Sequence, residues 1–270
     1  MARRGLLPPL FRPEPGAPLV GAATVRRVAA ALLLFAVLWL TIFASLSLLG
    51  TTMGSEFQAP ATPQLFMVHA ILLVTLAIWF TLGFVGPRGG TAFASSSPGR
   101  QFGLRAPSIA AELGLGVLCG VAAWLVVLTL LLGLGALVWA LGGGDSLPRE
   151  APPIVPWIAS LPLALRLAIS ASAGFVEELF FRGFLQPRVG IGLSTTLFAL
   201  AHLSYDQPLM LVGVTLLSVT FAFIVRWRQS IWAAVVAHAV FDAIQLVVVI
   251  PWALRYMEAG GAEFVAVVVW

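Results

Sequence analysis

Long apolar runs constrain the fold of this chain more than any other feature. The 270 residues include uncharged stretches such as 28–49 and 113–141. A transmembrane helix needs about 20 consecutive apolar residues, because the hydrocarbon core of a bilayer is about 30 Å thick. Only 10% of the residues are charged, against about 25% in soluble domains, which is too few to cover a water-facing surface. The sequence therefore predicts an all-α, polytopic membrane helical bundle.

The apolar runs predict about seven to eight transmembrane helices and divide the chain into four parts. A Pro- and Arg-rich segment, residues 1–27, is expected to be flexible and cytoplasmic. Residues 28–153 hold three predicted helices, and residues 154–250 hold a predicted catalytic core. Residues 251–270 form a C-terminal tail, and whether it makes an eighth helix stays open.

Arginine residues lie mainly in alternate loops. Most of them fall in four segments: 1–27, 86–108, 188–192 and 226–229. The intervening loops at 50–64, 142–153 and 204–207 contain a single basic residue, Arg149. Cytoplasmic loops are enriched in basic residues, so we predict a multi-pass protein of the cell inner (plasma) membrane with a cytoplasmic N-terminus. The basic residues do not gather on a polar domain, which argues against nucleic-acid binding.

Breaks in the apolar pattern set the helix limits expected in the predicted core. Gly190-Ile191-Gly192 should interrupt one helix. The next helix is predicted from Pro208 to about Val225, and the last from Ile231 to Ile250. The basic turn 226–229 should separate these two.

Ionisable side chains interrupt the later apolar runs. These residues are Glu177, Glu178, Arg182, His202, His238 and Asp242. An ionisable group at the bilayer centre costs roughly 2.5–3.5 kcal/mol to insert, so each is a functional candidate. Counted from the predicted cytoplasmic turns at about 1.5 Å per residue, Glu177, His202 and His238 all lie roughly 15 Å deep. We therefore expect three helices to bring a carboxylate and two imidazoles to the same level.

The spacing of these residues predicts which of them face one another. Glu178 and Arg182 are four residues apart and can pair on one helix face. Glu177 points about 100° away from Glu178 and is free to face another helix. His238 and Asp242 also share a face. Outside this set, we interpret His69 as structural, Glu112 as interfacial and Cys119 as a buried apolar residue.

The residue types in this set suit hydrolysis. A carboxylate beside a neutral imidazole can take a proton from water, and the hydroxide can then attack a peptide carbonyl. A second imidazole, oriented by Asp242, can donate to the developing oxyanion. No Ser or Cys is obviously paired with these groups, which argues against an acyl-enzyme. Two His and one or two carboxylates can also bind Zn²⁺, but H-E-x-x-H is absent and we favour a site without a tightly held metal.

At these residues the chain resembles the CPBP intramembrane protease family, which includes the CAAX-processing endopeptidases and the bacterial Abi-type proteins. The family signatures E-E-x-x-x-R, F-x-x-x-H and H-x-x-x-N/D match Glu177-Glu178-Leu179-Phe180-Phe181-Arg182, Phe198-Ala199-Leu200-Ala201-His202 and His238-Ala239-Val240-Phe241-Asp242. All three occur in order within predicted membrane helices. The resemblance covers roughly residues 154–250.

The resemblance implies a role for each residue of the three motifs. Glu177 and His202 would activate the water, His238 and Asp242 would form the oxyanion side, and Glu178 with Arg182 would brace the site. The CAAX-processing branch typically has Asn where this chain has Asp242. A charged Asp cannot donate the hydrogen bond that an Asn amide can. Asp242 would therefore be protonated, orient His238 or help to bind a metal, and the CAAX substrate is put in question.

The sequence thus predicts an intramembrane endopeptidase that acts on a peptide or membrane-protein substrate. The oligomeric state stays undetermined. A proton-coupled transporter is the first alternative, because buried Glu, His and Asp also form proton relays. It would favour paired half-sequences with broken helices, and none is evident. A catalytically silent membrane scaffold is the second alternative.

Overall fold

The computed structural model describes most of the chain from residue 61 to residue 259. The described residues are 61–81, 102–144, 154–203 and 208–259, with isolated positions at 28, 31–32, 34–39, 42, 99, 147 and 152. The predicted flexible segment 1–27 and much of the first apolar run lie outside them. All regular structure in the described part is helical, which confirms the predicted all-α fold.

The helices follow one another along the chain with short breaks. They are α2 (Thr62–Leu65), α3 (Met67–Thr81), α5 (Ile109–Ala140), α6 (Ile154–Ser160), α7 (Leu163–Glu177), the π-helix η3 (Glu178–Leu185), α8 (Gln186–Leu200), α9 (Pro208–Arg228), α10 (Trp232–Ala243), the π-helix η5 (Ile244–Val249) and α11 (Ile250–Glu258).

Three of the described helices are long and apolar enough to cross a membrane, namely Ile109–Ala140, Pro208–Arg228 and Trp232–Glu258. A fourth span is present if α6 and the helix from Leu163 to Leu200 are counted together across their 117° bend. The protein is therefore a multi-pass membrane protein. The predicted count of seven to eight helices is not confirmed by the described residues.

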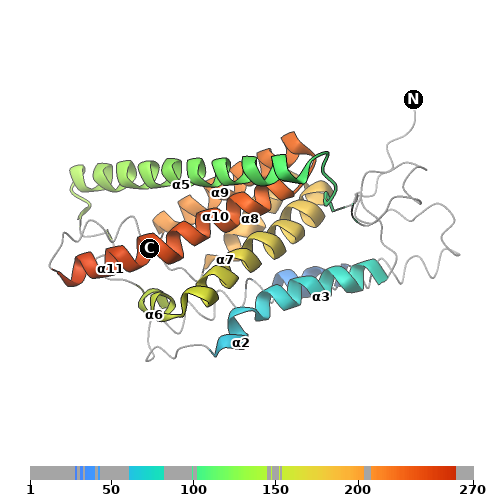
Figure 1. Cartoon of the computed structure of the whole chain (residues 1–270), viewed down its shortest axis with the longest axis horizontal. Helices are drawn as coiled ribbons and strands as arrows, with labels where there is room; N and C mark the ends of the chain where they lie inside the picture. The colour runs from blue at the N-terminus through green and yellow to red at the C-terminus, as the bar shows by residue number, and fades with distance from the viewer. Residues whose placement is uncertain are drawn as a thin grey trace, which may run out of the picture.

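Helix α10 lies at the centre of the bundle and carries one end of the candidate site. It packs against α5, α7 and α9, while α3 packs against α7 and η3. Figure 1 shows α5, α10, α7 and α3 following one another across the molecule. Because α10 touches helices from both sides, the position of His238 depends on three neighbours at once.

Small residues let α5 and α10 approach closely. The buried face of α5 repeats every three or four residues and consists of Glu112, Gly116, Gly120, Ala123, Val127, Leu131 and Gly135. A Cβ added to Gly120 would lie 2.7 Å from the Ala237 carbonyl oxygen, and one added to Gly116 would lie 2.5 Å from Val236 Cβ. Membrane helices pack through such small residues, because lipid supplies no hydrophobic force between them.

We therefore expect Gly120→Ala to destabilise the fold. The added methyl group forces α5 away from α10, and overpacking of this kind costs about 1–3 kcal/mol. Gly114→Ala is the matched control on the same helix, because no atom lies within 4 Å of its added Cβ. Unfolding of both variants in detergent micelles measures the difference. Equal stability of the two variants would contradict the close packing.

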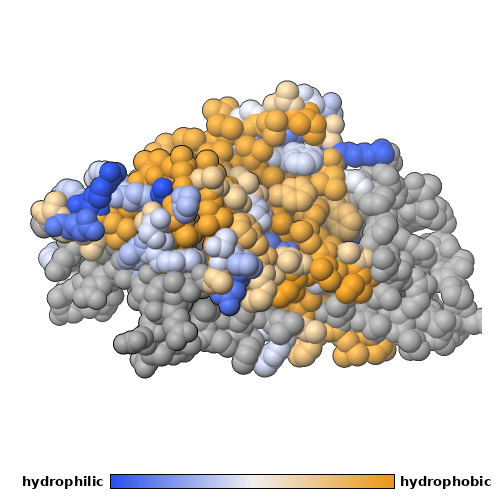
Figure 2. All heavy atoms as spheres, turned by 60° about the horizontal axis from the view of Figure 1, so that its bottom comes forward, coloured by the Kyte–Doolittle hydropathy of each residue, from blue (hydrophilic) through white to orange (hydrophobic). Residues whose placement is uncertain are grey.

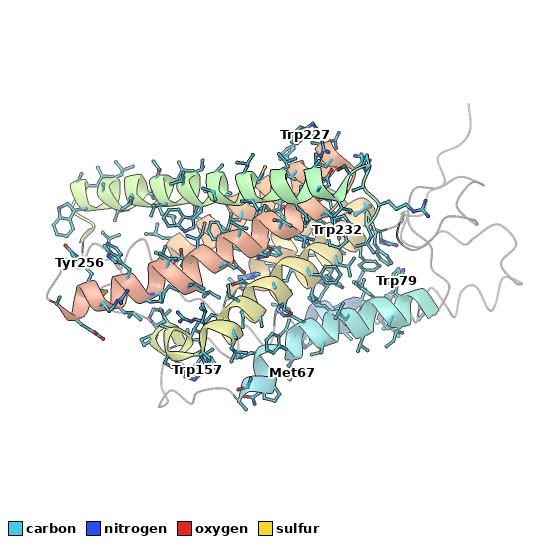
Figure 3. The ribbon with its side chains drawn as sticks, viewed as in Figure 1. Met67, Trp79, Trp157, Trp227, Trp232 and Tyr256 are labelled. Atoms are coloured by element: carbon cyan, nitrogen blue, oxygen red, sulfur yellow. The ribbon has the colours of Figure 1, made fainter. Side chains whose placement is uncertain are left out.

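The outer surface of the bundle is apolar. Leu118 and Leu141 of the α5 region are 70% and 78% exposed, and Figure 2 shows hydrophobic side chains over much of one face. Exposed aromatic side chains lie near opposite ends of the molecule, with Trp227 at one end and Tyr256 at the other (Figure 3). Aromatic residues are enriched at membrane–water interfaces, so this pattern fits a bundle surrounded by lipid.

The predicted break at residues 190–192 is confirmed at Gly190. Its backbone has φ 88° and ψ 167°, a conformation open mainly to glycine. The chain therefore kinks within α8 before it reaches His202.

The predicted limits of the last two long helices are wrong. Helix α9 continues through the basic turn to Arg228, and the break comes at Gln229, which has φ 55°. Arg228 stays helical because its side chain binds Glu112 of α5, with Nη2 2.6 Å from Oε1. Glu112 is fully buried, so it is an interhelical ion-pair partner rather than a simple interfacial residue. The last helix also continues past Ile250 to Glu258.

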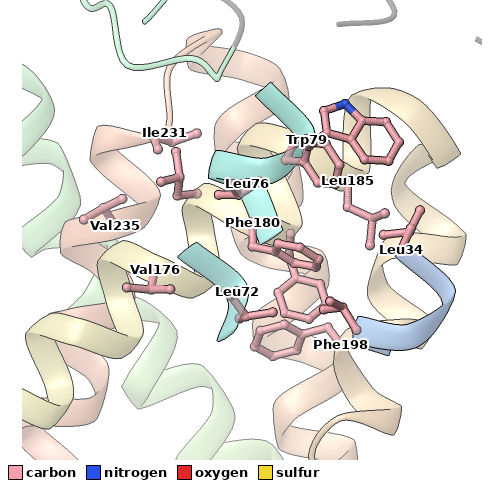
Figure 4. Packing of buried hydrophobic residues seen from close by; sticks show 14 residues of the cluster. Leu34, Leu72, Leu76, Trp79, Val176, Phe180, Leu185, Phe198, Ile231 and Val235 are labelled. Carbon is pink, nitrogen blue, oxygen red and sulfur yellow. The ribbon is translucent and has the colours of Figure 1, made fainter. Parts of the chain in front are cut away.

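The segment that carries the E-E-x-x-x-R motif is buried on every side. All eight residues of the π-helix η3 are buried. Its Phe180 and Phe184 are fully buried in a cluster with Leu72 and Trp79 of α3 and Phe198 of α8, part of which Figure 4 shows from close by. The Trp79 and Phe184 rings meet edge to face at 5.0 Å. This aromatic packing holds the motif rigidly between its neighbours.

Candidate active site

Glu178 is the centre of a buried network of charged side chains. Its Oε1 lies 2.8 Å from Arg182 Nη1 and 2.9 Å from His238 Nδ1. Glu178 is fully buried and Arg182 is 1% exposed. The predicted pairing of Glu178 with Arg182 is therefore confirmed, and the structure adds His238 as a second partner. A carboxylate accepts only, so His238 donates its Nδ1–H.

The Arg182 guanidinium is held on several sides. Its Nη2 donates to the Ser218 carbonyl oxygen at 3.4 Å. Its Cζ lies 4.3 Å from the centroid of the Phe198 ring and 5.8 Å from that of Phe221. Cation–π contacts of this kind gain strength away from water. Arg182 thus ties η3 to α8 and α9 as well as neutralising Glu178.

His238 is also held by a second carboxylate and an aromatic ring. Its Nε2 lies 3.6 Å from Asp242 Oδ2, which is an ion-pair distance rather than a hydrogen bond. Its ring stacks on Phe221, with centroids 5.2 Å apart. The predicted shared face of His238 and Asp242 is confirmed. Asp242 is 26% exposed, so this end of the network is its most open part.

Glu177, the last residue of α7, faces away from Glu178 as predicted. Its Oε1 lies 3.3 Å from His69 Nε2, and its Oε2 lies 3.9 Å from His202 Nε2. The distance to His202 is too long for a direct hydrogen bond. Oε2 is buried and makes no hydrogen bond with any residue that the structure describes.

His202 presents one ring nitrogen to Glu177 and the other to its own helix. Its Nδ1 lies 2.7 Å from the Phe198 carbonyl oxygen. A carbonyl only accepts, so Nδ1 carries the proton and Nε2 of the neutral ring is an acceptor. The Phe198 ring lies between the imidazoles, with its centroid 4.5 Å from that of His202 and 6.3 Å from that of His238. Phe198 is therefore a packing residue that spaces the two.

All six residues predicted for the site lie in one continuous cluster. They come from α7, η3, the end of α8 and α10, and the adjacent Glu177 and Glu178 join its two halves. The sequence prediction missed two members. His69 of α3 contacts Glu177, and Ser172 Oγ lies 2.7 Å from His69 Nδ1. One signal was available for His69, because it is an ionisable residue within an apolar run. Ser172 gave no signal, since serine is common in membrane helices.

The side chains do not form an evident metal site. Within the described part of the chain, no group of three or more His, Cys, Asp or Glu side chains is placed to hold a metal ion. In the cluster, each carboxylate of the two motif glutamates approaches a different set of imidazoles. This donor arrangement does not fit the four-coordinate zinc sites of proteins.

A pocket of about 380 Å³ lies beside the cluster, near the start of α10. Of the six predicted site residues only Arg182 lines it, together with Phe102, Gly103, Gly183, Gln186, Pro187, Gly190, Ile191, Val225, Arg226, Gln229 and Ile231. The pocket therefore touches the brace of the site and not Glu177 or His202.

Comparison with known proteins adds a family to this geometry. Residues 159–244 match the family model of type II CAAX prenyl endopeptidase Rce1-like proteins, and this range contains all six predicted site residues. The uncharacterized protein YpbD of Bacillus subtilis (strain 168) is 31% identical over 71 residues, which cover 26% of this chain and 38% of that relative. The chain thus spans less than half the length of that relative. None of the solved structures matches the chain. Through residues 159–244, the chain belongs to the CPBP family of intramembrane proteases.

Proposed function

We propose that the protein is an intramembrane endopeptidase in which Glu177 and His202 activate a water molecule. One observation carries the proposal: Glu177 Oε2 and His202 Nε2 are both acceptors, and they lie 3.9 Å apart. Two acceptors cannot bond each other, but one water at about 2.8 Å from each can donate one hydrogen to each. The two side chains therefore match the two hydrogens of a single water.

The hydrolytic step follows from this arrangement. The water oxygen attacks the carbonyl carbon of the scissile peptide bond while its proton passes to the Glu177 carboxylate. The carbonyl π electrons move to oxygen and form the oxyanion. Collapse of this intermediate breaks the C–N bond, and the proton held by Glu177 goes to the leaving nitrogen. Atoms and charge balance without a covalent enzyme intermediate.

We assign His238 and Asp242 to the oxyanion side. With both ring nitrogens protonated, His238 donates Nδ1–H to Glu178 and directs Nε2–H toward the Asp242 end of the site, the more open one. Two carboxylates, the Arg182 guanidinium and the imidazolium then balance in charge. Asp242 orients His238 and replaces the amide that the CAAX-processing branch carries, so donation to the oxyanion falls to His238.

The proposed steps use no metal, because the donor arrangement does not fit zinc. The substrate class that we propose is a peptide bond of a membrane-associated protein, since the cluster lies between apolar helices. The CAAX-type and Abi-type assignments and the choice of substrate within that class are proposals that rest on the family match over residues 159–244.

Comparative proteomics of membranes tests the function. We expect membrane proteins that are shortened in cells with the wild-type chain and full-length in cells with Glu177→Gln. Glu258→Gln, the same change on an exposed carboxylate of α11, is the matched control and should behave as wild type. Identical protein fragments with wild type and Glu177→Gln would overturn the proposal.

We further propose that the protein lies in the cell inner membrane with its N-terminus and the 86–108 loop in the cytoplasm. In a Cys119→Ala background, a cysteine at Ser146 should react with an impermeant reagent in intact cells. A cysteine at Ser96 should react only after permeabilisation. Both positions lie outside the described residues, so the test rests on the Arg distribution alone. Labelling of Ser96→Cys in intact cells would reverse the orientation.

A further inference from the structure

All three histidines of the chain lie at the candidate site, although the family motifs account for only two. The third, His69, belongs to α3 and lies outside the matched range 159–244. It contacts Glu177 and Ser172 and is 11% exposed. We propose that His69, held by Ser172, is a positioning residue that orients the Glu177 carboxylate for water activation. This inference rests on the proposed function.

The direction of the hydrogen bonds follows from the groups involved. The Glu177 carboxylate only accepts, so the His69 proton lies on Nε2 and points at Oε1. The neutral ring then has an acceptor at Nδ1, and the Ser172 hydroxyl donates to it over 2.7 Å. The donor chain therefore runs from Ser172 to His69 to Glu177. Ser172 selects the His69 tautomer, because only a donor satisfies Nδ1.

The contact with His69 decides which oxygen of Glu177 can act as a base. Oε1 accepts from His69, whereas Oε2 makes no hydrogen bond with any described residue and lies 3.9 Å from His202. Without His69, the Glu177 side chain can rotate and take Oε2 away from His202. His69 therefore acts on the geometry of the water site without touching the water itself.

The same three groups occur in the order of a serine-hydrolase triad, in which a serine gives its proton to a histidine oriented by a carboxylate. The arrangement here favours positioning, because the second oxygen of Glu177 faces another imidazole. The two roles predict different effects of Ser172→Ala. A positioning serine is dispensable in part, whereas a nucleophilic serine is essential.

Nuclear magnetic resonance of ¹⁵N-histidine in the full chain tests the contact without substrate. The spectrum contains three imidazoles, which can be assigned by replacing each in turn. We expect His69 as the neutral Nε2–H tautomer, with an Nδ1 signal that shifts in Ser172→Ala and an Nε2 signal that shifts in Glu177→Gln. Ser170→Ala is the matched control, since Ser170 lies on the same helix and donates to the Arg166 carbonyl. Unchanged His69 signals in both test variants would overturn the proposal.

Kinetics with a quenched-fluorescent farnesylated peptide then separates the roles. His69→Leu should lower kcat by roughly tenfold to a hundredfold, the usual effect of losing an orienting partner, with KM nearly unchanged. His69→Gln keeps an N–H donor and should recover part of kcat. Ser172→Ala should lose less than about tenfold. A loss as complete as that of Glu177→Gln would make Ser172 the nucleophile and refute the positioning role. Failure of wild type to cleave this peptide counts against the proposed substrate, while the resonance experiment still decides the contact.

Discussion

Replacing Glu177 by Gln abolishes most cleavage while the protein stays folded. The substitution keeps the shape of the side chain and its contact with His69, but the amide cannot take the proton of the water. General-base catalysis contributes roughly 10²–10⁴-fold, so kcat should fall by that factor. Glu177 is 14% exposed and lies outside the Glu178 network, so folded yield and KM should change little.

His202→Ala provides the second half of this test. If His202 and Glu177 hold one water between them, each single variant should lose nearly the whole effect. The double variant should be little worse than either, because residues that act as a unit are not additive. The rate of peptide-bond cleavage by purified protein is the measurement, with Glu258→Gln as control. Multiplied losses in the double variant would show two independent roles and refute the shared water.

The second large effect is on stability, at Arg182. Arg182→Ala leaves the Glu178 carboxylate buried with His238 as its remaining close partner. Removing one member of a buried ion pair typically costs about 3–5 kcal/mol, and here it also removes the contacts with Phe198 and Ser218. We therefore expect a low folded yield and a lower free energy of unfolding in detergent.

A double replacement separates the ion pair from general damage. Glu178→Leu with Arg182→Met removes both charges and should recover part of the stability, because no buried charge is left unpaired. Recovery should be incomplete, since His238 loses its acceptor. Arg255→Ala is the matched control on an exposed helix face and should change stability by less than about 0.5 kcal/mol. Equal damage in the single and double variants would argue against an energetic pair.

The sequence predicted the residues of the site better than their surroundings. The pairing of Glu178 with Arg182 and the shared face of His238 and Asp242 follow from helical spacing, which is local and regular. The kink at Gly190 was predictable because glycine alone tolerates its φ. The meeting of Glu177 with His202 was plausible from depth, and the structure adds the direction in which each side chain points.

His69 shows where the sequence prediction ends. Its contact with Glu177 joins residues 108 positions apart, and nothing in the local pattern of α3 says which neighbour that helix will face. Glu112 was misread for the same reason, since its partner Arg228 lies on another helix. The extension of α9 through Arg228 depends on that ion pair and not on helix propensity.

The two π-helices change what residue counting means in this protein. A stretch with i→i+5 hydrogen bonds holds one residue more than the α-helical ladder needs, and one residue corresponds to about 100° of rotation about the axis. A helical wheel drawn from α7 through Glu178–Leu185 is therefore out of phase by that angle when it reaches α8. Losing one residue from this stretch would shorten the helix by about 1.5 Å and would also turn Gln186 and the rest of α8 to another face. At this site a change of length is a change of direction, so its tolerance for deletions is far narrower than its tolerance for substitutions of similar volume.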